Sequence, residues 1–251
     1  MLITLRAKEP VVPSHLALRR AVGIVALGLP FALAVPWWIL RKSVESSISG
    51  YYYTDMRNIF IGSLCAIAVF MLCCRSYDRN DKAARTFSAL CALGVAYFPI
   101  EPDSRTTLHQ HQIGIAHYIF ATLLFSTFVY FCLVSFKMTA ANKKAARKQL
   151  QRNRVYTGCG YLIVSSIFLI CILKLFKVEH LIFGLDPTFC FESTALIAFG
   201  IAWLVKGETD MPGATEDKTP IRTQETSPIA SDELQSGGNF PPSTVCGTEQ
   251  A

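Results

Sequence analysis

The most constraining feature of the sequence is the stretch 109–136, HQHQIGIAHYIFATLLFSTFVYFCLVSF. Its first nine residues hold three of the five histidines of the chain. The apolar run that follows is long enough to cross the roughly 30 Å hydrocarbon core of a bilayer as one helix. His117 falls inside the helical pattern and not before it. The stretch therefore predicts a membrane helix that opens from a polar, histidine-bearing mouth.

Similar apolar runs recur along the chain, and together they predict six membrane spans. The predicted spans are 21–40, 58–74, 84–100, 114–136, 156–176 and 188–206. Charged residues make up 17% of the chain, whereas an ordinary soluble domain carries about 25%. Because backbone groups in hydrocarbon must be hydrogen-bonded within their own segment, these runs predict helices and an all-α fold.

The first apolar run has a second interpretation as a signal peptide, since Ala32-Leu33-Ala34 resembles a cleavage site. The run, however, continues past that site to Trp37-Trp38 before Arg41. An aromatic pair followed by a cation is typical of the interfacial end of a spanning helix. We therefore expect a span at 21–40.

The distribution of Lys and Arg predicts the orientation of the helices. The N-terminal segment, the loops 75–85 and 137–155 and the C-terminal tail together hold 18 of the 24 cations, and the other side holds 6. Cytoplasmic loops carry the excess of positive charge, so both termini are expected in the cytoplasm. We expect a six-helix membrane domain over 1–206 and a disordered acidic tail over 207–251, where eight acids face two bases.

With this topology, three polar loops meet on the external side and predict a pocket. The candidate ligand-binding residues are ionisable or aromatic side chains at or just below the interface: Tyr52 with its neighbours Tyr51 and Tyr53, Asp55, Arg57, His117 and Glu192. Ionisable groups at such depth cost free energy and normally face the bundle and find partners.

Each of these residues also has a purely structural interpretation. Arg57 and Glu192 could form a buried ion pair that joins the second span to the sixth. His117 could donate to a neighbouring carbonyl oxygen and do nothing more. The three tyrosines could be an ordinary interfacial belt.

A metal site is a weaker possibility. It would use His109, His111 and His117, together with His180 and nearby carboxylates, and zinc is the metal whose chemistry fits such ligands. The spacing matches no strong signature, because HExxH and CxxC motifs are absent from the sequence. We therefore expect no cofactor and keep zinc as the alternative.

The basic segment 139–156, TAANKKAARKQLQRNRVY, reads as a helical extension on the cytoplasmic side. Cations beside a membrane attract anionic lipid headgroups, so the bilayer and such headgroups at the cytoplasmic loops are the expected partners. The segment carries no interleaved aromatic residues, and we expect no nucleic-acid partner.

Three segments carry a resemblance to a known group of proteins: SISGYYYTDMRNIFIGSL (47–64), RNRVYTGCGYLIV (152–164) and FESTALIAFGIAWLVKGE (191–208). The chain resembles bacterial six-helix integral membrane proteins of uncharacterised function, and its layout is remotely similar to the DRAM-type family. The resemblance implies a bacterial inner (cytoplasmic) membrane location. It would place Arg-Asp where this chain has Arg57-Asn58, so Asp55 would have to supply the acid.

The residues favour a non-enzymatic membrane protein whose outward-facing pocket senses or binds a small ligand or a lipid headgroup. The alternative is a membrane-embedded lipid hydrolase that could depend on a metal, because histidines and carboxylates gather near the headgroup level. A transporter ranks last, since the middle of the spans offers only hydroxyl side chains.

Overall fold

The described part of the chain consists of helices and their connecting segments. The computed structural model describes residues 15–74, 79–102, 107–137, 143–176 and 184–209. The α-helices are α1 (His15–Arg41), α2 (Arg57–Cys73), α3 (Arg79–Tyr97), α4 (Leu108–Tyr130), α5 (Lys143–Phe176) and α6 (Pro187–Thr209). A short 3₁₀ helix, η1 (Ser49–Tyr53), precedes α2, and a π-helical segment, η2 (Phe131–Ser135), extends α4. The all-α prediction is confirmed for these residues.

Four of the helices are long and apolar enough to cross a membrane. They are Ala17–Arg41, Leu108–Ser135, Gln149–Phe176 and Pro187–Gly207. Helix α2 is apolar but has only 17 residues. Helix α3 has 19 residues, but four of its first seven, Arg79, Asp81, Lys82 and Arg85, are charged. By length and composition, the described residues therefore contain four candidate spans.

Several helices begin earlier than the apolar runs predict. Helix α3 begins at Arg79, so that Arg85, which was expected in a loop, lies in its second turn. Helix α4 begins at Leu108 because Thr107 and Gln110 form a capping box, in which each side chain accepts from the backbone N–H of the other. Because of this earlier start, His117 lies more than two turns inside α4.

Helices α5 and α6 also extend past their predicted bounds. The predicted basic extension is helical from Lys143 onward and is continuous with the rest of α5. Helix α6 begins at Pro187, whose predecessor Asp186 accepts the Thr188 N–H at 2.7 Å, and it continues to Thr209, beyond the predicted domain boundary at 206. The predicted disordered tail from 210 onward lies outside the described residues.

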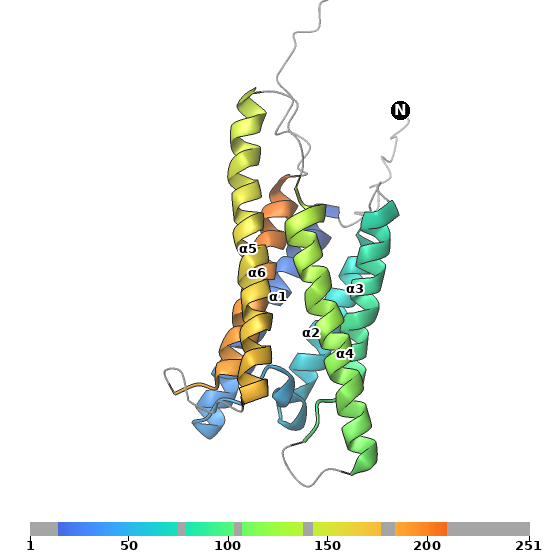
Figure 1. The fold of residues 1–251 in the computed structure, drawn as a ribbon, viewed down its shortest axis with the longest axis vertical. Coiled ribbons are helices and arrows are strands. Elements are labelled where there is room, and N and C mark those ends of the chain that lie inside the picture. The colour runs from blue at the N-terminus through green and yellow to red at the C-terminus, as the bar shows by residue number, and fades with distance from the viewer. Residues whose placement is uncertain (1–14, 75–78, 103–106, 138–142, 177–183, 210–251) are drawn as a thin grey trace, which may run out of the picture. The chain divides into compact units, whose positions relative to one another are not determined.

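The six helices pack in a closed circuit. Each helix packs against the next one in the sequence, and α6 packs back against α1 (Figure 1). The core of this circuit is apolar and includes large aromatic side chains of α4, η2 and α6. Phe128 stacks on Phe199 with ring centroids 3.6 Å apart, and Phe131 meets Trp203 edge to face. Large apolar side chains also remain exposed on α1 and α5, two of the helices that are long and apolar enough to cross a membrane.

The contact between α1 and α6 depends on two glycines. A Cβ atom added at Gly200 would lie 2.8 Å from the carbonyl oxygen of Gly23, and one added at Gly23 would lie 2.7 Å from Cγ of Leu204. Both distances are too short for a real Cβ atom, so the two backbones approach as closely as glycine permits. Small residues at such crossings are the usual way in which membrane helices associate.

We predict that Gly200→Ala destabilises the protein by about 1–3 kcal/mol, because the new methyl group overlaps the α1 backbone. Thermal unfolding of the purified protein in detergent measures this change. Gly28→Ala on α1 is the matched control, since nothing lies within 4 Å of the added Cβ atom. An equal response of the two variants would contradict the close contact of α1 with α6.

Candidate ligand-binding site

His117 joins three segments at one end of the helix circuit. It is only 2% exposed, and both of its ring nitrogens have partners. Its Nδ1 lies 2.7 Å from the carbonyl oxygen of Phe98, just past the end of α3, and its Nε2 lies 2.9 Å from the hydroxyl of Ser49 in η1. Because a carbonyl oxygen only accepts, Nδ1 donates, and the neutral ring then accepts the Ser49 hydroxyl at Nε2. The predicted hydrogen bond to a carbonyl is therefore present.

Glu192 of α6 binds the backbone next to Ser49. The backbone N–H of Ile48 donates to Oε2 of Glu192 at 2.6 Å. The residues Ile48 and Ser49 are thus tied to α6 by a carboxylate and to α4 by a histidine. We call this end of the circuit, with Ser49, Phe98, His117 and Glu192, the histidine end.

Two tyrosines complete the anchoring of the segment that precedes α2. Tyr51 is fully buried and accepts the Glu45 N–H at 3.4 Å, and burial raises the pKa of its phenol, which keeps the hydroxyl protonated. Tyr53 donates to the carbonyl oxygen of Ile100 at 2.6 Å. Tyr51 is therefore a core residue and not part of an interfacial belt.

His117 and Glu192 line a small cavity of about 60 Å³ inside the circuit, whose other walls include Ser49, Leu124 and Leu196. Glu192 also lines a second cavity of about 210 Å³ between α4, α5 and α6, which we call the Glu192 cavity. Its polar lining residues are Ser47, Thr122, Lys174, Thr188 and Glu192, and its apolar ones are Ile100, Tyr118, Ala121, Phe125, Ile167, Ile170 and Cys171.

Charge is present at the polar end of the Glu192 cavity. Lys174, an exposed residue near the end of α5, lies close enough to Glu192 to interact with it electrostatically. Ser47 and Thr188 add hydroxyl groups, while the α4 and α5 walls are mostly apolar. The cavity therefore offers a carboxyl group, a cation and hydroxyls at one end and a hydrocarbon-like surface at the other.

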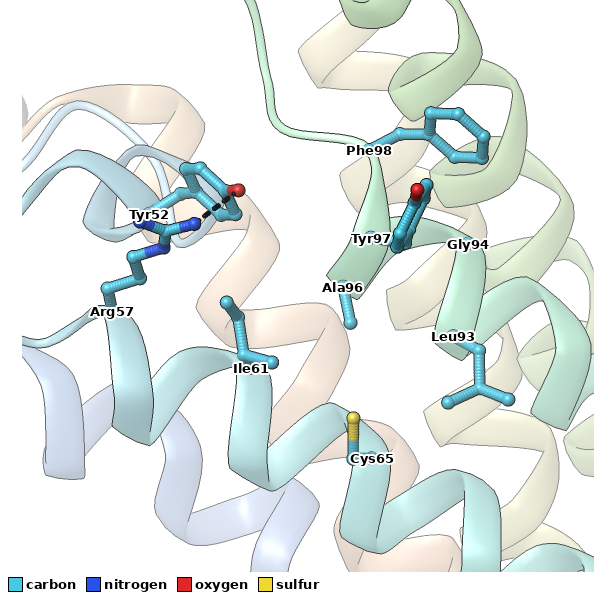
Figure 2. A pocket seen from close by; sticks show the side chains of 9 residues that line it. All are labelled: Tyr52, Arg57, Ile61, Cys65, Leu93, Gly94, Ala96, Tyr97 and Phe98. Atoms are coloured by element: carbon cyan, nitrogen blue, oxygen red, sulfur yellow. Dashed lines mark hydrogen bonds between the residues drawn. The ribbon is translucent and has the colours of Figure 1, made fainter.

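Arg57 and Tyr52 lie at a separate cleft between α2 and α3. Figure 2 shows the Arg57 guanidinium beside the Tyr52 ring, across the cleft from Tyr97. Nη2 of Arg57 donates to the Tyr52 hydroxyl at 2.7 Å, and the guanidinium carbon lies 4.3 Å from the ring centroid. The cleft has a volume of about 600 Å³ and apolar walls that include Ile61 and Leu93.

These placements correct the prediction of one pocket. Tyr52 and Arg57 line the α2–α3 cleft, whereas His117 and Glu192 line the cavity inside the circuit. Asp55 lies in neither and forms an exposed ion pair with Arg41 at 3.6 Å. The suggested pair of Arg57 with Glu192 is wrong as well, because Arg57 stacks on Tyr52 and Glu192 accepts from Ile48.

The histidines considered for a metal site are spread over different surroundings. His109 is exposed, and Nδ1 of His111 lies 3.1 Å from Oε2 of Glu101. His117 uses both nitrogens within the protein. In the part of the chain that the structure describes, no three His, Cys, Asp or Glu side chains form a group that could hold a metal ion. His180 lies outside the described residues, so the zinc hypothesis stays a prediction.

Sequence reasoning missed the polar partners of the two central residues. Ser49 lies 68 positions from His117, and Ile48 lies 144 positions from Glu192. No local pattern connects residues so far apart. Lys174 was not among the predicted site residues, although its position two turns after Ile167 on α5 places it at the same cavity.

We predict that His117 and Ser49 are energetically coupled. In a double-mutant cycle with His117→Phe and Ser49→Ala, thermal unfolding should report a coupling free energy of about 0.5–1.5 kcal/mol, which is typical of hydrogen bonds between membrane helices. Ser46→Ala, at an exposed neighbouring position, should show no coupling to His117. Equal couplings for Ser46 and Ser49 would mean that the hydrogen bond does not form.

A second cycle tests the separation of Arg57 from Glu192. With Arg57→Gln and Glu192→Gln, we expect a coupling below about 0.5 kcal/mol, as found for residues without shared partners. Tyr52→Leu and Arg57→Gln should instead couple measurably, because they remove the two halves of one stacked pair. A large coupling free energy between Arg57 and Glu192 would instead support the ion pair.

Comparison with known proteins adds no relative: no family model, curated protein or solved structure matches this chain significantly.

Proposed function

We propose that the protein is a six-helix integral membrane protein that binds a small amphipathic ligand, such as a lipid, in the Glu192 cavity. The observation that carries this proposal is the composition of the cavity, in which Glu192, Lys174 and two hydroxyls lie at one end of an apolar space between helices. A ligand with a polar head and a hydrocarbon tail matches both parts.

The size of the cavity favours part of an amphiphile over a complete drug-sized molecule. Its volume of about 210 Å³ lies below the roughly 300–1,000 Å³ of typical small-molecule sites. A single acyl chain could enter between α4 and α5 while the rest of the ligand stays in the bilayer. A headgroup that carries both an amine and an acid would complement Glu192 and Lys174.

The proposal includes spans at α2 and α3 in addition to the four long apolar helices. Both pack within the circuit between α1 and α4. Beyond Arg85, the buried face of α3 consists mostly of small residues, among them Ser88, Ala89, Ala92 and Gly94, which is typical of helices that pack inside membranes. With six spans and the excess of Lys and Arg on one side, both termini are cytoplasmic and the histidine end faces outward.

The partners that follow are lipids on both sides of the membrane. The outward ligand would occupy the Glu192 cavity, and the basic start of α5 would contact anionic headgroups on the cytoplasmic side. A bacterial inner membrane, which the family resemblance implies, provides both.

Binding accounts for the geometry of the histidine end better than hydrolysis does. A general base must reach the proton that it removes. Both nitrogens of His117 are occupied by Phe98 and Ser49, so the ring would first have to release Ser49. The lipid hydrolase therefore remains the alternative, with or without zinc.

The proposal is tested by filling the cavity. Ala121→Phe places a ring into the space that Ala121 lines, and it should lower the amount of lipid retained by the purified protein at least severalfold. The probe is a single-chain lysophosphatidylethanolamine, added to the protein in detergent and counted by native mass spectrometry. Glu192→Gln should weaken retention by removing the carboxyl group while keeping an acceptor for Ile48.

Leu123→Phe is the matched control, because Leu123 lies on α4 with an exposed side chain and does not line the cavity. It should retain the lysolipid as the unmodified protein does. Equal retention by Ala121→Phe, Leu123→Phe and the unmodified protein would rule out the Glu192 cavity as the binding site.

A further inference from the structure

The opposite end of the helix circuit contains a buried cation with unused hydrogen-bond donors. The side chain of Arg85 is 6% exposed, although it carries a permanent positive charge. Neither Nε nor Nη2 of Arg85 has a hydrogen-bond partner within the described residues. Buried charges are normally paired and hydrogen-bonded, because an unsatisfied charged group is costly.

The acid nearest to Arg85 satisfies it only in part. Nη2 of Arg85 lies 3.5 Å from Oδ2 of Asp81, one turn earlier on α3, which is an ion-pair distance and too long for a good hydrogen bond. Asp81 is shared, since its other carboxylate oxygen accepts a hydrogen bond from the Ser135 hydroxyl. The Asp81 carboxylate is therefore not available to Arg85 alone.

More positive charge gathers around this pair. Arg19 of α1 lies close enough to Arg85 to repel it electrostatically, and Lys206 of α6 interacts with both arginines and with Arg152 of α5. Asp81 attracts Arg85 and Lys206, and Arg19 and Arg152 add positive charge beside them. The local excess of positive charge would be relieved by a bound anion.

A cavity of about 290 Å³ lies at this position. Arg85 lines it together with Lys82 and Thr86 of α3 and with Cys73 and Cys74 at the end of α2. None of its described lining residues is acidic. A guanidinium fork, an ammonium and a hydroxyl are donors that suit an anion with several oxygens.

We infer that this cavity binds a phosphate group through Arg85, with Lys82 and Thr86 as further donors. The phosphate can come from a soluble phosphate or from the headgroup of an anionic phospholipid, and the chemistry of recognition is the same. The inference does not rest on the ligand proposed for the Glu192 cavity, because it uses different residues at the other end of the helices.

The test compares Arg85→Gln with Arg79→Gln. Both variants remove one positive charge from α3, but Arg79 is exposed and does not line the cavity. The full chain is placed in phosphatidylcholine nanodiscs and titrated with inorganic phosphate at constant ionic strength, with chloride as the reference anion, and thermal unfolding is followed. A second set of nanodiscs contains phosphatidylcholine and phosphatidylglycerol in equal amounts, and native mass spectrometry counts the lipids retained.

A soluble phosphate ligand is supported if phosphate raises the Tm of the unmodified protein and Arg79→Gln, while Arg85→Gln needs at least about tenfold more phosphate. A lipid source is supported if phosphate has no effect, but phosphatidylglycerol is retained by those two proteins and lost from Arg85→Gln. Identical behaviour of Arg85→Gln and Arg79→Gln in both arms overturns the inference. If Arg85→Gln does not fold, Lys82→Gln takes its place in the same comparison.

Discussion

The contact between α1 and α6 at Gly23 and Gly200 closes the circuit of helices, and the rest of the structure depends on it. Every other helix pair in the circuit joins neighbours in the sequence, which short connections bring together in any case. The first and last helices have no such help and meet through backbone approach, which only glycine allows. Once they meet, α6 places Glu192 at the histidine end and Lys206 near Arg85 at the opposite end. Both polar clusters therefore depend on this packing.

Polar groups are concentrated at the two ends of an apolar core, and the two ends are built differently. At the histidine end, His117 and Glu192 are satisfied by groups from other segments and fix the turn at Ile48 and Ser49. At the other end, Arg85 keeps donors without hydrogen-bond partners among the described residues. A satisfied polar cluster rigidifies a structure, whereas an unsatisfied one points to a ligand. At the histidine end, the ligand is therefore expected beside the polar cluster, in the Glu192 cavity. At the other end, the anion is expected to bind Arg85 itself.

The helices could be predicted from the sequence because apolar length is a local property. The start of α4 was also readable, since Thr107 and Gln110 have the spacing of a capping box. Arg85 could have been found as well, because it continues the helical spacing of the buried residues Ser88, Ala89 and Ala92 by one turn. The partners of His117 and Glu192 could not, since they depend on contacts between distant segments. The predicted Arg57–Glu192 pair was wrong because a local contact replaced a distant one. Tyr52, only five residues away, offers Arg57 a nearer partner.

The central claim is that all six helices cross the membrane, which places the histidine end and Arg85 on opposite sides. The start of α3 tests it most directly, because α2 and α3 either cross the membrane or stay on the outer side together. Cysteines are introduced one at a time at the exposed positions Ser46, Asn80 and Gln151. Intact and permeabilised cells are treated with a membrane-impermeant maleimide, and peptide mass spectrometry assigns the labelling to the introduced cysteine. The account predicts that Ser46→Cys reacts in intact cells, whereas Asn80→Cys and Gln151→Cys react only after permeabilisation. Labelling of Asn80→Cys in intact cells, alongside Ser46→Cys, would contradict it.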